Sequence, residues 1–316
     1  MSYIDKKVCL RDRDIDFIKF LAEYGITKNE NVKLFYNSEY YYRNRLASLA
    51  KGKIIERLYG KVVLGRNGKI YLNKIGIGYR NINRNETYKK RLERISDICC
   101  KIRLCGWYFE PSWKCNLSTY TKRGNRYFGV MSRLENVLTK NGWSYYKKSY
   151  IVYYFPKDIT QKELRYIYKE IDRNKNTFRG LIVIIEDDVW KYHKNFEHFA
   201  YGESYLIPHN ESSWKILNII NDETFMPYLP YEVYGDKLES IVNYSIFREY
   251  YFKEGELTTY VYYMPFLNFF MLKHINENVN DKSYKDTEHK LVCLDNCILE
   301  ARKYLDEKVQ IICFET

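Results

Sequence analysis

Residues 180–185, Gly-Leu-Ile-Val-Ile-Ile, form an unbroken apolar run that ends directly before three acidic residues. A strand with one face in water alternates apolar and polar side chains, whereas a continuous apolar run is typical of a strand buried on both faces of a parallel sheet. Parallel strands need crossover connections, which are usually helices. The flanking sequence contains such helices, which are predicted over 160–174 and 189–199. They would join this run to strands predicted over 149–155 and 204–207. We therefore predict a small α/β domain.

This α/β domain is expected to cover residues 106–235, because strand-like and helix-like segments begin to alternate after Gly106. A strand is predicted over 107–109, a helix over 128–140 and another helix over 212–220. Residues 236–316 are predicted to add a mainly helical extension, with one helix over 287–305.

The N-terminal eighty residues have a different pattern. Helices are predicted over 10–25, 27–35 and 38–52, with Ser38 as the N-cap of the third and Gly52 as its stop. Strand-like segments follow at 54–59 and 69–74, and the Asn-Gly within Gly65-Arg-Asn-Gly68 predicts a tight hairpin turn between them. Three helices followed by a basic-tipped hairpin are typical of a winged helix-turn-helix, which we expect over residues 1–82. The predicted fold class is α+β.

The third helix has a defined phase. Tyr42, Leu46 and Leu49 recur at helical spacing and are expected to face inward. The same phase turns a second set of side chains outward, where they are expected to contact bases in a major groove: Tyr41, Asn44, Arg45 and Ser48. Phosphate contacts are expected from one residue on the flank of this helix and two at the predicted hairpin tip: Arg43, Arg66 and Lys69.

The polar segment 81–85 is the predicted domain boundary, and residues 83–105 are expected to form a connector. An amphipathic helix is predicted over 86–104, with Leu92, Ile95, Cys99 and Ile102 as its apolar stripe. Such a helix serves equally as a connector and as the contact of a homodimer that binds two half-sites.

Charge and composition restrict the partners. The net charge is +12 and the pI about 9.1, which favours a polyanionic partner, although abundant Lys, Asn, Ile and Tyr also suit an AT-rich genome. No signal peptide or membrane-spanning run is recognised, so we expect a cytoplasmic protein that contacts no membrane. Double-stranded DNA is the expected partner, and no cofactor, metal or small-molecule substrate is expected.

Four segments together resemble the N-terminal half of the replication-relaxation family, which comprises plasmid- and mobile-element-encoded proteins: LRDRDIDFIKFLAEY at 10–24, YRNRLASL at 42–49, IIER at 54–57 and IYLNKIG at 70–76. The resemblance covers about residues 10–80. It implies a winged helix joined to a C-terminal domain similar to a PD-(D/E)xK nuclease core, and an association with plasmid replication and DNA relaxation. For this chain we expect a role in replication initiation, DNA transfer or transcriptional regulation for a plasmid, phage or integrated element.

An enzyme is the alternative function. A metal-dependent nickase of this type needs an acid on one strand and Glu-x-Lys on the next, but the segment 149–155 contains no acid. Glu110 and Asp187 are the acidic candidates for metal-dependent cleavage. A tyrosine-based relaxase is a second possible enzyme. We expect a degenerate, non-catalytic nuclease-like domain. A third possibility is a scaffold whose winged helix binds protein.

Overall fold

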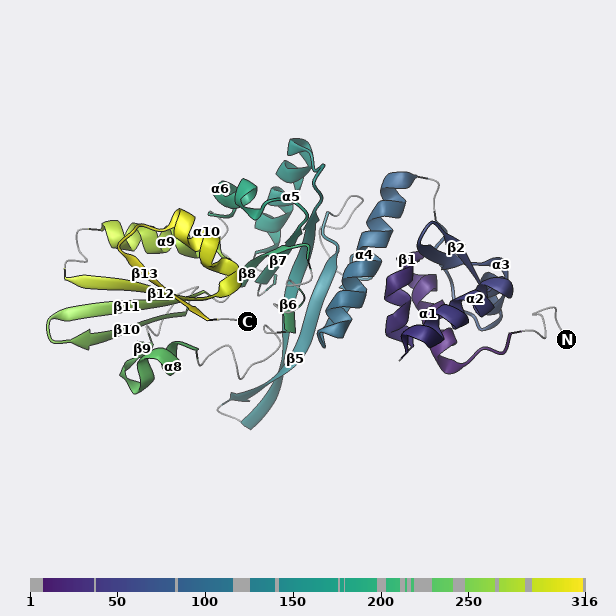
Figure 1. Ribbon diagram of the computed structural model, residues 1–316, viewed down its shortest axis with the longest axis horizontal. Coiled ribbons are helices and arrows are strands. Elements are labelled where there is room, and N and C mark those ends of the chain that lie inside the picture. The colour runs from purple at the N-terminus through teal and green to yellow at the C-terminus, as the bar shows by residue number, and fades with distance from the viewer. Residues whose placement is uncertain are drawn as a thin grey trace. The chain divides into compact units, whose positions relative to one another are not determined.

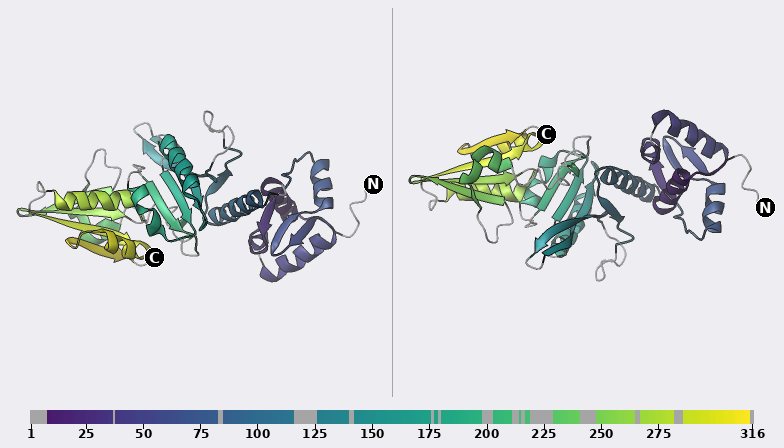
Figure 2. Two further views of the ribbon diagram at one scale, coloured as in Figure 1. Left: turned by 90° about the horizontal axis from the view of Figure 1, so that it is seen from above. Right: turned by 90° about the horizontal axis from the view of Figure 1, so that it is seen from below.

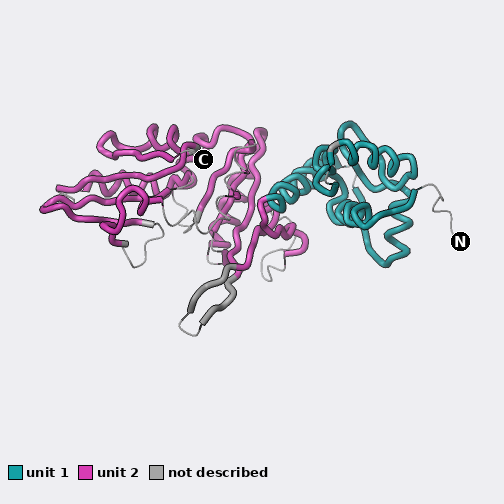
Figure 3. Tube along the Cα trace, turned by 60° about the horizontal axis from the view of Figure 1, so that its bottom comes forward, with its two compact units in different colours: residues 1–104 teal, residues 105–316 magenta. Residues whose placement is uncertain are grey.

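The computed structural model describes residues 8–36, 38–82, 85–115, 126–139, 142–175, 177–178, 180–197, 203–210, 214, 217–218, 229–240, 248–264, 267–281 and 286–314. The chain divides into two compact units, residues 1–104 and residues 105–316 (Figure 3). Both contain helices and sheets, so the fold class α+β is confirmed.

The described residues of unit 1 form three strands and five helical segments, and most of them are labelled in Figure 1. Its elements in chain order are α1 (Asp12–Tyr24), β1 (Ile26–Lys28), the 3-10 helix η1 (Asn29–Phe35), α2 (Glu39–Lys51), β2 (Ile55–Leu58), β3 (Lys61–Leu64), α3 (Arg66–Lys74) and α4 (Glu86–Leu104). The three helices predicted in the first fifty residues are present, although the second is a 3-10 helix. The sheet order is β1-β3-β2, and all its pairs are antiparallel.

The hairpin is real, but its predicted position is wrong. Its turn is Tyr59-Gly60, between the paired residues Leu58 and Lys61, and both turn residues have positive φ. Residues 69–74, predicted as the second strand, belong to helix α3.

The two glycines of Gly65-Arg-Asn-Gly68 serve close packing and not a turn. A Cβ on Gly65 would lie 2.4 Å from the carbonyl oxygen of Lys53, and one on Gly68 would lie 2.2 Å from that of Ile54. Only glycine lets the start of α3 approach the chain this closely.

Helix α4 has the predicted bounds, and its predicted stripe is buried. It packs within unit 1 through a buried acid, because Asp97 accepts hydrogen bonds from Lys28 Nζ at 2.9 Å and from Asn31 Nδ2 at 3.0 Å. Glu93 of the same helix forms an ion pair with Lys61 on β3. The expected connector is therefore an integral part of unit 1.

The first half of unit 2 is a five-stranded mixed sheet in the order β4-β5-β6-β7-β8. Its elements are β4 (Tyr108–Pro111), β5 (Gly129–Thr139), β6 (Gly142–Phe155), α5 (Gln161–Asn174), β7 (Gly180–Ile185), η2 (Val189–Tyr192), α6 (His193–Phe196) and β8 (Glu203–Pro208). The buried run 180–185 is β7, and it lies between two parallel neighbours as predicted.

The helix predicted over 128–140 is wrong. That segment is strand β5, which pairs antiparallel with β6 over its whole length. Apolar residues at 130, 134 and 137 fit a helical period, but a long cross-strand ladder decides the local structure here. The helix predicted over 212–220 falls largely outside the described residues.

The second half of unit 2 corrects the predicted helical extension. It contains a second five-stranded sheet. Its elements are α8 (Leu229–Tyr234), η3 (Gly235–Lys237), β9 (Glu239–Ser240), β10 (Arg248–Glu254), β11 (Leu257–Met264), α9 (Phe269–Asn280), β12 (Thr287–Leu294), η4 (Asp295–Cys297), α10 (Ile298–Tyr304) and β13 (Val309–Phe314). The predicted helix over 287–305 therefore begins as a strand. Tyrosine, threonine and valine dominate β11, and these residues favour strands.

The two sheets of unit 2 have the same strand topology, and Figure 2 shows unit 2 from two further sides. Each sheet has its five strands side by side in chain order, with two antiparallel pairs and then two parallel pairs. Helix α5 joins the third and fourth strands of one sheet, and α9 does so in the other. Equivalent contacts support the repeat, since the Tyr153 hydroxyl donates to Glu170 on α5 while the Tyr262 hydroxyl accepts from Asn278 on α9. One hydrophobic core includes residues from both sheets of unit 2 and from their helices.

Candidate nucleic-acid interface

The net positive charge of the chain comes from one unit. Residues 1–104 contain 24 Lys and Arg against 11 Asp and Glu, a net charge of +13. Residues 105–316 contain 28 against 29, a net charge of −1. An electrostatic attraction to a polyanion therefore has its origin in unit 1.

Within unit 1 the charge is concentrated further. Residues 39–82, which include α2, the β2–β3 hairpin and α3, contain ten Lys and Arg and two acids, Glu39 and Glu56. Arg45, Lys61 and Arg80 have internal partners. Six of the ten basic side chains are exposed: Arg43, Lys51, Lys53, Arg57, Arg66 and Lys74.

Helix α2 presents one exposed face. Ser38 begins the helix by accepting a hydrogen bond from the Tyr41 N–H, and Gly52 ends it. The predicted inward residues, Tyr42, Leu46 and Leu49, are all buried. The exposed positions follow the helical period: Tyr40, Arg43, Asn44, Ala47 and Lys51. Tyr40 is 79% exposed.

Arg45 is not on that face, contrary to the prediction. Its guanidinium forms a bidentate pair with Asp14 on α1, with Nη2 2.5 Å from Oδ2 and Nε 2.8 Å from Oδ1. Asp14 is fully buried and also accepts from the Arg11 N–H and the Tyr36 hydroxyl. Burial alone would raise the pKa of Asp14, but these hydrogen bonds outweigh it, and the pKa lies below its ordinary value.

Tyr41 and Ser48 also differ from the prediction, because both are half-buried. The Tyr41 hydroxyl accepts a hydrogen bond from Arg11 Nη1 at 2.6 Å, and its ring packs near Tyr36. The buried carboxylate of Asp14 draws this edge of α2 toward α1. Of the four residues expected to face bases, Asn44 is exposed as predicted, and the exposed row continues through its neighbours Tyr40 and Arg43.

The two predicted hairpin-tip cations lie on helix α3 instead. Arg66 is the first residue of α3 and is exposed. Lys69 is half-buried, with Nζ 5.9 Å from the ring centroid of Tyr79. The start of α3 adjoins the end of α2, since Asn67 Nδ2 donates to the Gly52 carbonyl at 2.9 Å. Arg66 is therefore close in the fold to the exposed Lys51 and Lys53.

The true hairpin tip is apolar and exposed. Leu58 is 47% exposed and the Tyr59 side chain is fully exposed. Sequence reasoning missed both residues because Tyr-Gly is a weaker turn signal than the Asn-Gly eight residues later.

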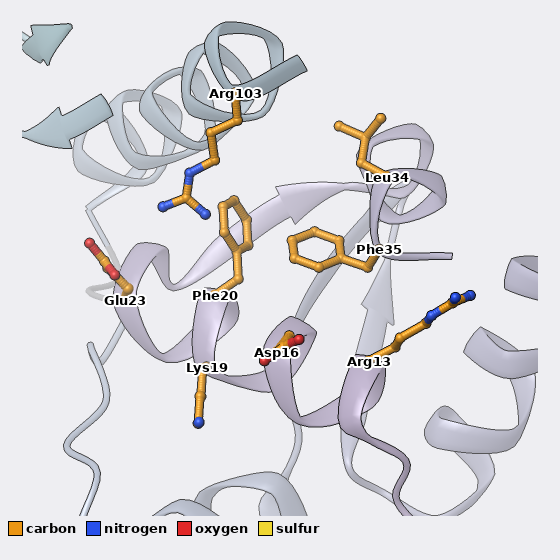
Figure 4. Close-up of a pocket in the computed structure, with 8 residues that line it drawn as sticks. All are labelled: Arg13, Asp16, Lys19, Phe20, Glu23, Leu34, Phe35 and Arg103. Atoms are coloured by element: carbon orange, nitrogen blue, oxygen red, sulfur yellow. The ribbon is translucent and has the colours of Figure 1, made fainter. Parts of the chain in front are cut away.

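A separate pocket of about 450 Å³ on unit 1 is lined by residues of α1, η1 and α4. The rings of Phe20 and Phe35 form its floor, with centroids 5.1 Å apart, and the guanidinium of Arg103 lies beside Phe20 (Figure 4). Side chains of both signs surround these rings: Arg13, Asp16, Lys19 and Glu23. This mixture does not select for a ligand of one charge.

The acidic candidates of unit 2 are not brought together. Glu110 is on β4 and Asp187 follows β7, so three strand spacings, about 14 Å, separate their strands. A hydrogen bond from Lys191 lowers the pKa of Asp187. All fourteen residues of β6 lack an acidic side chain. Among the described residues, no three or more His, Cys, Asp and Glu side chains gather where a metal ion would fit.

No described helix is long and apolar enough to cross a bilayer. Comparison with known proteins gives no further guide, since no family model, curated protein or solved structure matches the chain.

Proposed function

We propose that unit 1 is a winged helix-turn-helix that binds double-stranded DNA. In this proposal α2 is the helix that enters the major groove and the β2–β3 hairpin is the wing. The observation that carries the proposal is the excess of ten basic over two acidic residues in the segment 39–82, which contains α2 and its exposed face. The order α1, β1, η1, α2 and then the hairpin supports it.

The dimensions of α2 suit this role. Its 13 residues correspond to a length of about 20 Å, and a major groove about 12 Å wide admits a helix. Arg43 and Asn44 are exposed at its centre. Arginine pairs with guanine and asparagine with adenine through two hydrogen bonds each, so these two residues are proposed to read bases.

The other exposed cations are proposed to contact phosphates. Lys51 and Lys53 follow the exposed row of α2, Arg66 begins α3 beside them, and Arg57 lies on β2. Arg45 has a different task in this proposal, because its bond to Asp14 fixes the orientation of α2 on α1. The original set of base contacts is revised accordingly to Tyr40, Arg43 and Asn44.

The biological role is proposed from the family resemblance. The protein would act in the cytoplasm for a plasmid, phage or integrated element, in replication initiation, DNA transfer or transcriptional regulation, and as a homodimer if its site is palindromic. We propose no catalysis for unit 2. Its net charge of −1 and the separation of Glu110 from Asp187 support that assignment.

The test is selection of bound duplexes from a random library by the full-length protein, followed by titration of the selected site at fixed salt. Arg43→Ala should weaken binding by about 1–3 kcal/mol and relax specificity at one position, whereas Lys51→Ala should lower the salt slope by about one. Lys162→Ala, an exposed lysine of α5, is the matched control and should change neither. Failure to enrich any sequence, or equal effects of Arg43→Ala and Lys162→Ala, would exclude this interface.

A further inference from the structure

The hairpin tip of unit 1 combines an unfavourable backbone with an exposed aromatic ring. Tyr59 has φ of +45° and Gly60 has φ of +78°, as in a two-residue turn with both central residues left-handed. Asparagine, aspartate and glycine adopt this conformation readily, whereas a tyrosine there is an uncommon and strained choice.

Burial does not explain this choice. The side chain of Tyr59 is fully exposed, and the neighbouring Leu58 is 47% exposed. A strained residue whose side chain contacts nothing in its own fold is a candidate for contact with a ligand.

The surroundings define the chemistry of that ligand. The tip belongs to the segment 39–82, which contains ten cations and two acids, and the exposed Arg57 precedes the tip. A polyanion is therefore attracted to the tip, and its recognition there must involve a flat apolar ring. Aromatic rings stack on the faces of unpaired bases, whereas bases within a continuous duplex have both faces covered by their neighbours.

We propose that Tyr59 stacks on an unpaired base, so that the protein prefers duplex DNA with a strand-separated segment beside its binding site. This inference rests on the proposed function, because α2 must first hold the duplex. It extends that function by naming DNA with unpaired bases as the preferred substrate. Leu58 adds apolar contact to the same base.

The chain offers a matched substitution for the test. Tyr59→Asn creates the Asn-Gly sequence that such turns favour, so the variant should melt no lower than the wild type. Tyr59→Trp retains a stacking ring. Loss of function in Tyr59→Asn is thereby separated from loss of folding.

The experiment compares two probes with the full-length protein at one salt concentration: the selected duplex, and the same duplex with a short unpaired bubble beside the site. The wild type should bind the bubbled probe about tenfold more tightly. Tyr59→Asn should bind both probes equally, and Tyr59→Trp should keep the preference. A 2-aminopurine in the bubble should be quenched by the wild type and not by Tyr59→Asn.

Equal binding of both probes by the wild type would overturn the inference, as would a preference that survives in Tyr59→Asn. Equal weakening of both probes by Tyr59→Asn would also overturn it, because the tip would then contact paired DNA. These results leave the proposed function intact, whereas failure of the wild type to bind either probe contradicts the proposed function itself.

Discussion

Replacing Arg45 tests whether this residue stabilises the fold or reads DNA. Arg45→Ala removes two of the four hydrogen bonds to the Asp14 carboxylate, and both come from a cation. Hydrogen bonds to charged groups contribute about 1.5–3 kcal/mol each, and breaking a buried ion pair costs about 3–5 kcal/mol. We therefore expect Arg45→Ala to lower the free energy of unfolding of unit 1 by about 3–5 kcal/mol at neutral pH.

The measurement is amide hydrogen exchange of α1 and α2 in the full-length protein, which reports the stability of unit 1 separately from that of unit 2. Asp14→Ala with Arg45→Ala should cost less than the sum of the single variants by about 2 kcal/mol, because no unpaired charge remains buried. Arg43→Ala is the control, since its side chain is exposed on the same helix and its loss should change exchange little.

The pH dependence of stability gives a second, independent test of the Arg45–Asp14 pair. The folded-state pKa of Asp14 is lowered, so its ionisation stabilises unit 1 above the ordinary value of 3.8, and this contribution is lost as the pH falls through the lower folded value. The hydrogen bond from Arg45 is the largest of the effects that lower this pKa, so the pKa of Asp14 should rise in Arg45→Ala. The penalty of Arg45→Ala should therefore shrink as the pH approaches 4. Unchanged exchange at neutral pH together with lost DNA affinity would refute this reasoning and restore Arg45 as a DNA contact.

Two further predictions concern packing and pH. Gly68→Ala should destabilise unit 1 by about 1–3 kcal/mol, because the new Cβ would lie 2.2 Å from the Ile54 carbonyl oxygen, whereas Gly78→Ala meets nothing within 4 Å and should be tolerated; equal melting of the two variants would contradict the close packing. In unit 2, the hydrogen bond to Glu249 raises the pKa of His274, so this pair stabilises the fold fully below the ordinary value of 6.5 and loses its effect as the pH rises through the raised value. Glu249→Gln should abolish that dependence in exchange measurements on α9, and a wild-type profile retained in the variant would exclude the pair as its source.

Prediction from sequence succeeded where local pattern and burial agree. The buried parallel strand at 180–185, the capped helix α5 and the helix α4 all have strong periodicity or clear caps. The Thr160 capping box begins α5 at the start of the predicted helix 160–174, and both hydrogen bonds of that box are local.

It failed where the partner of a segment is distant in the chain. Strand β5 has a helical spacing of apolar residues but pairs with β6. Strands β12 and β13 pair with each other in a region that was predicted to be mainly helical. Gly65-Arg-Asn-Gly68 was predicted as a turn because the same residue type serves turns and close backbone approach. No local pattern distinguishes these uses.

For the candidate interface, the sequence alone determined that α2 exists, where it begins and ends, and which stripe of it is buried, because capping and helical periodicity are properties of neighbouring residues. Tertiary structure decided which flank faces outward. The carboxylate of Asp14, 31 residues away, binds Arg45 and turns that edge of α2 inward, leaving the exposed row to Tyr40, Arg43 and Asn44. Tertiary structure also places Arg66 and Lys69 on α3 and not on the hairpin, whose tip is Tyr59. Contacts between segments distant in the sequence determine these positions.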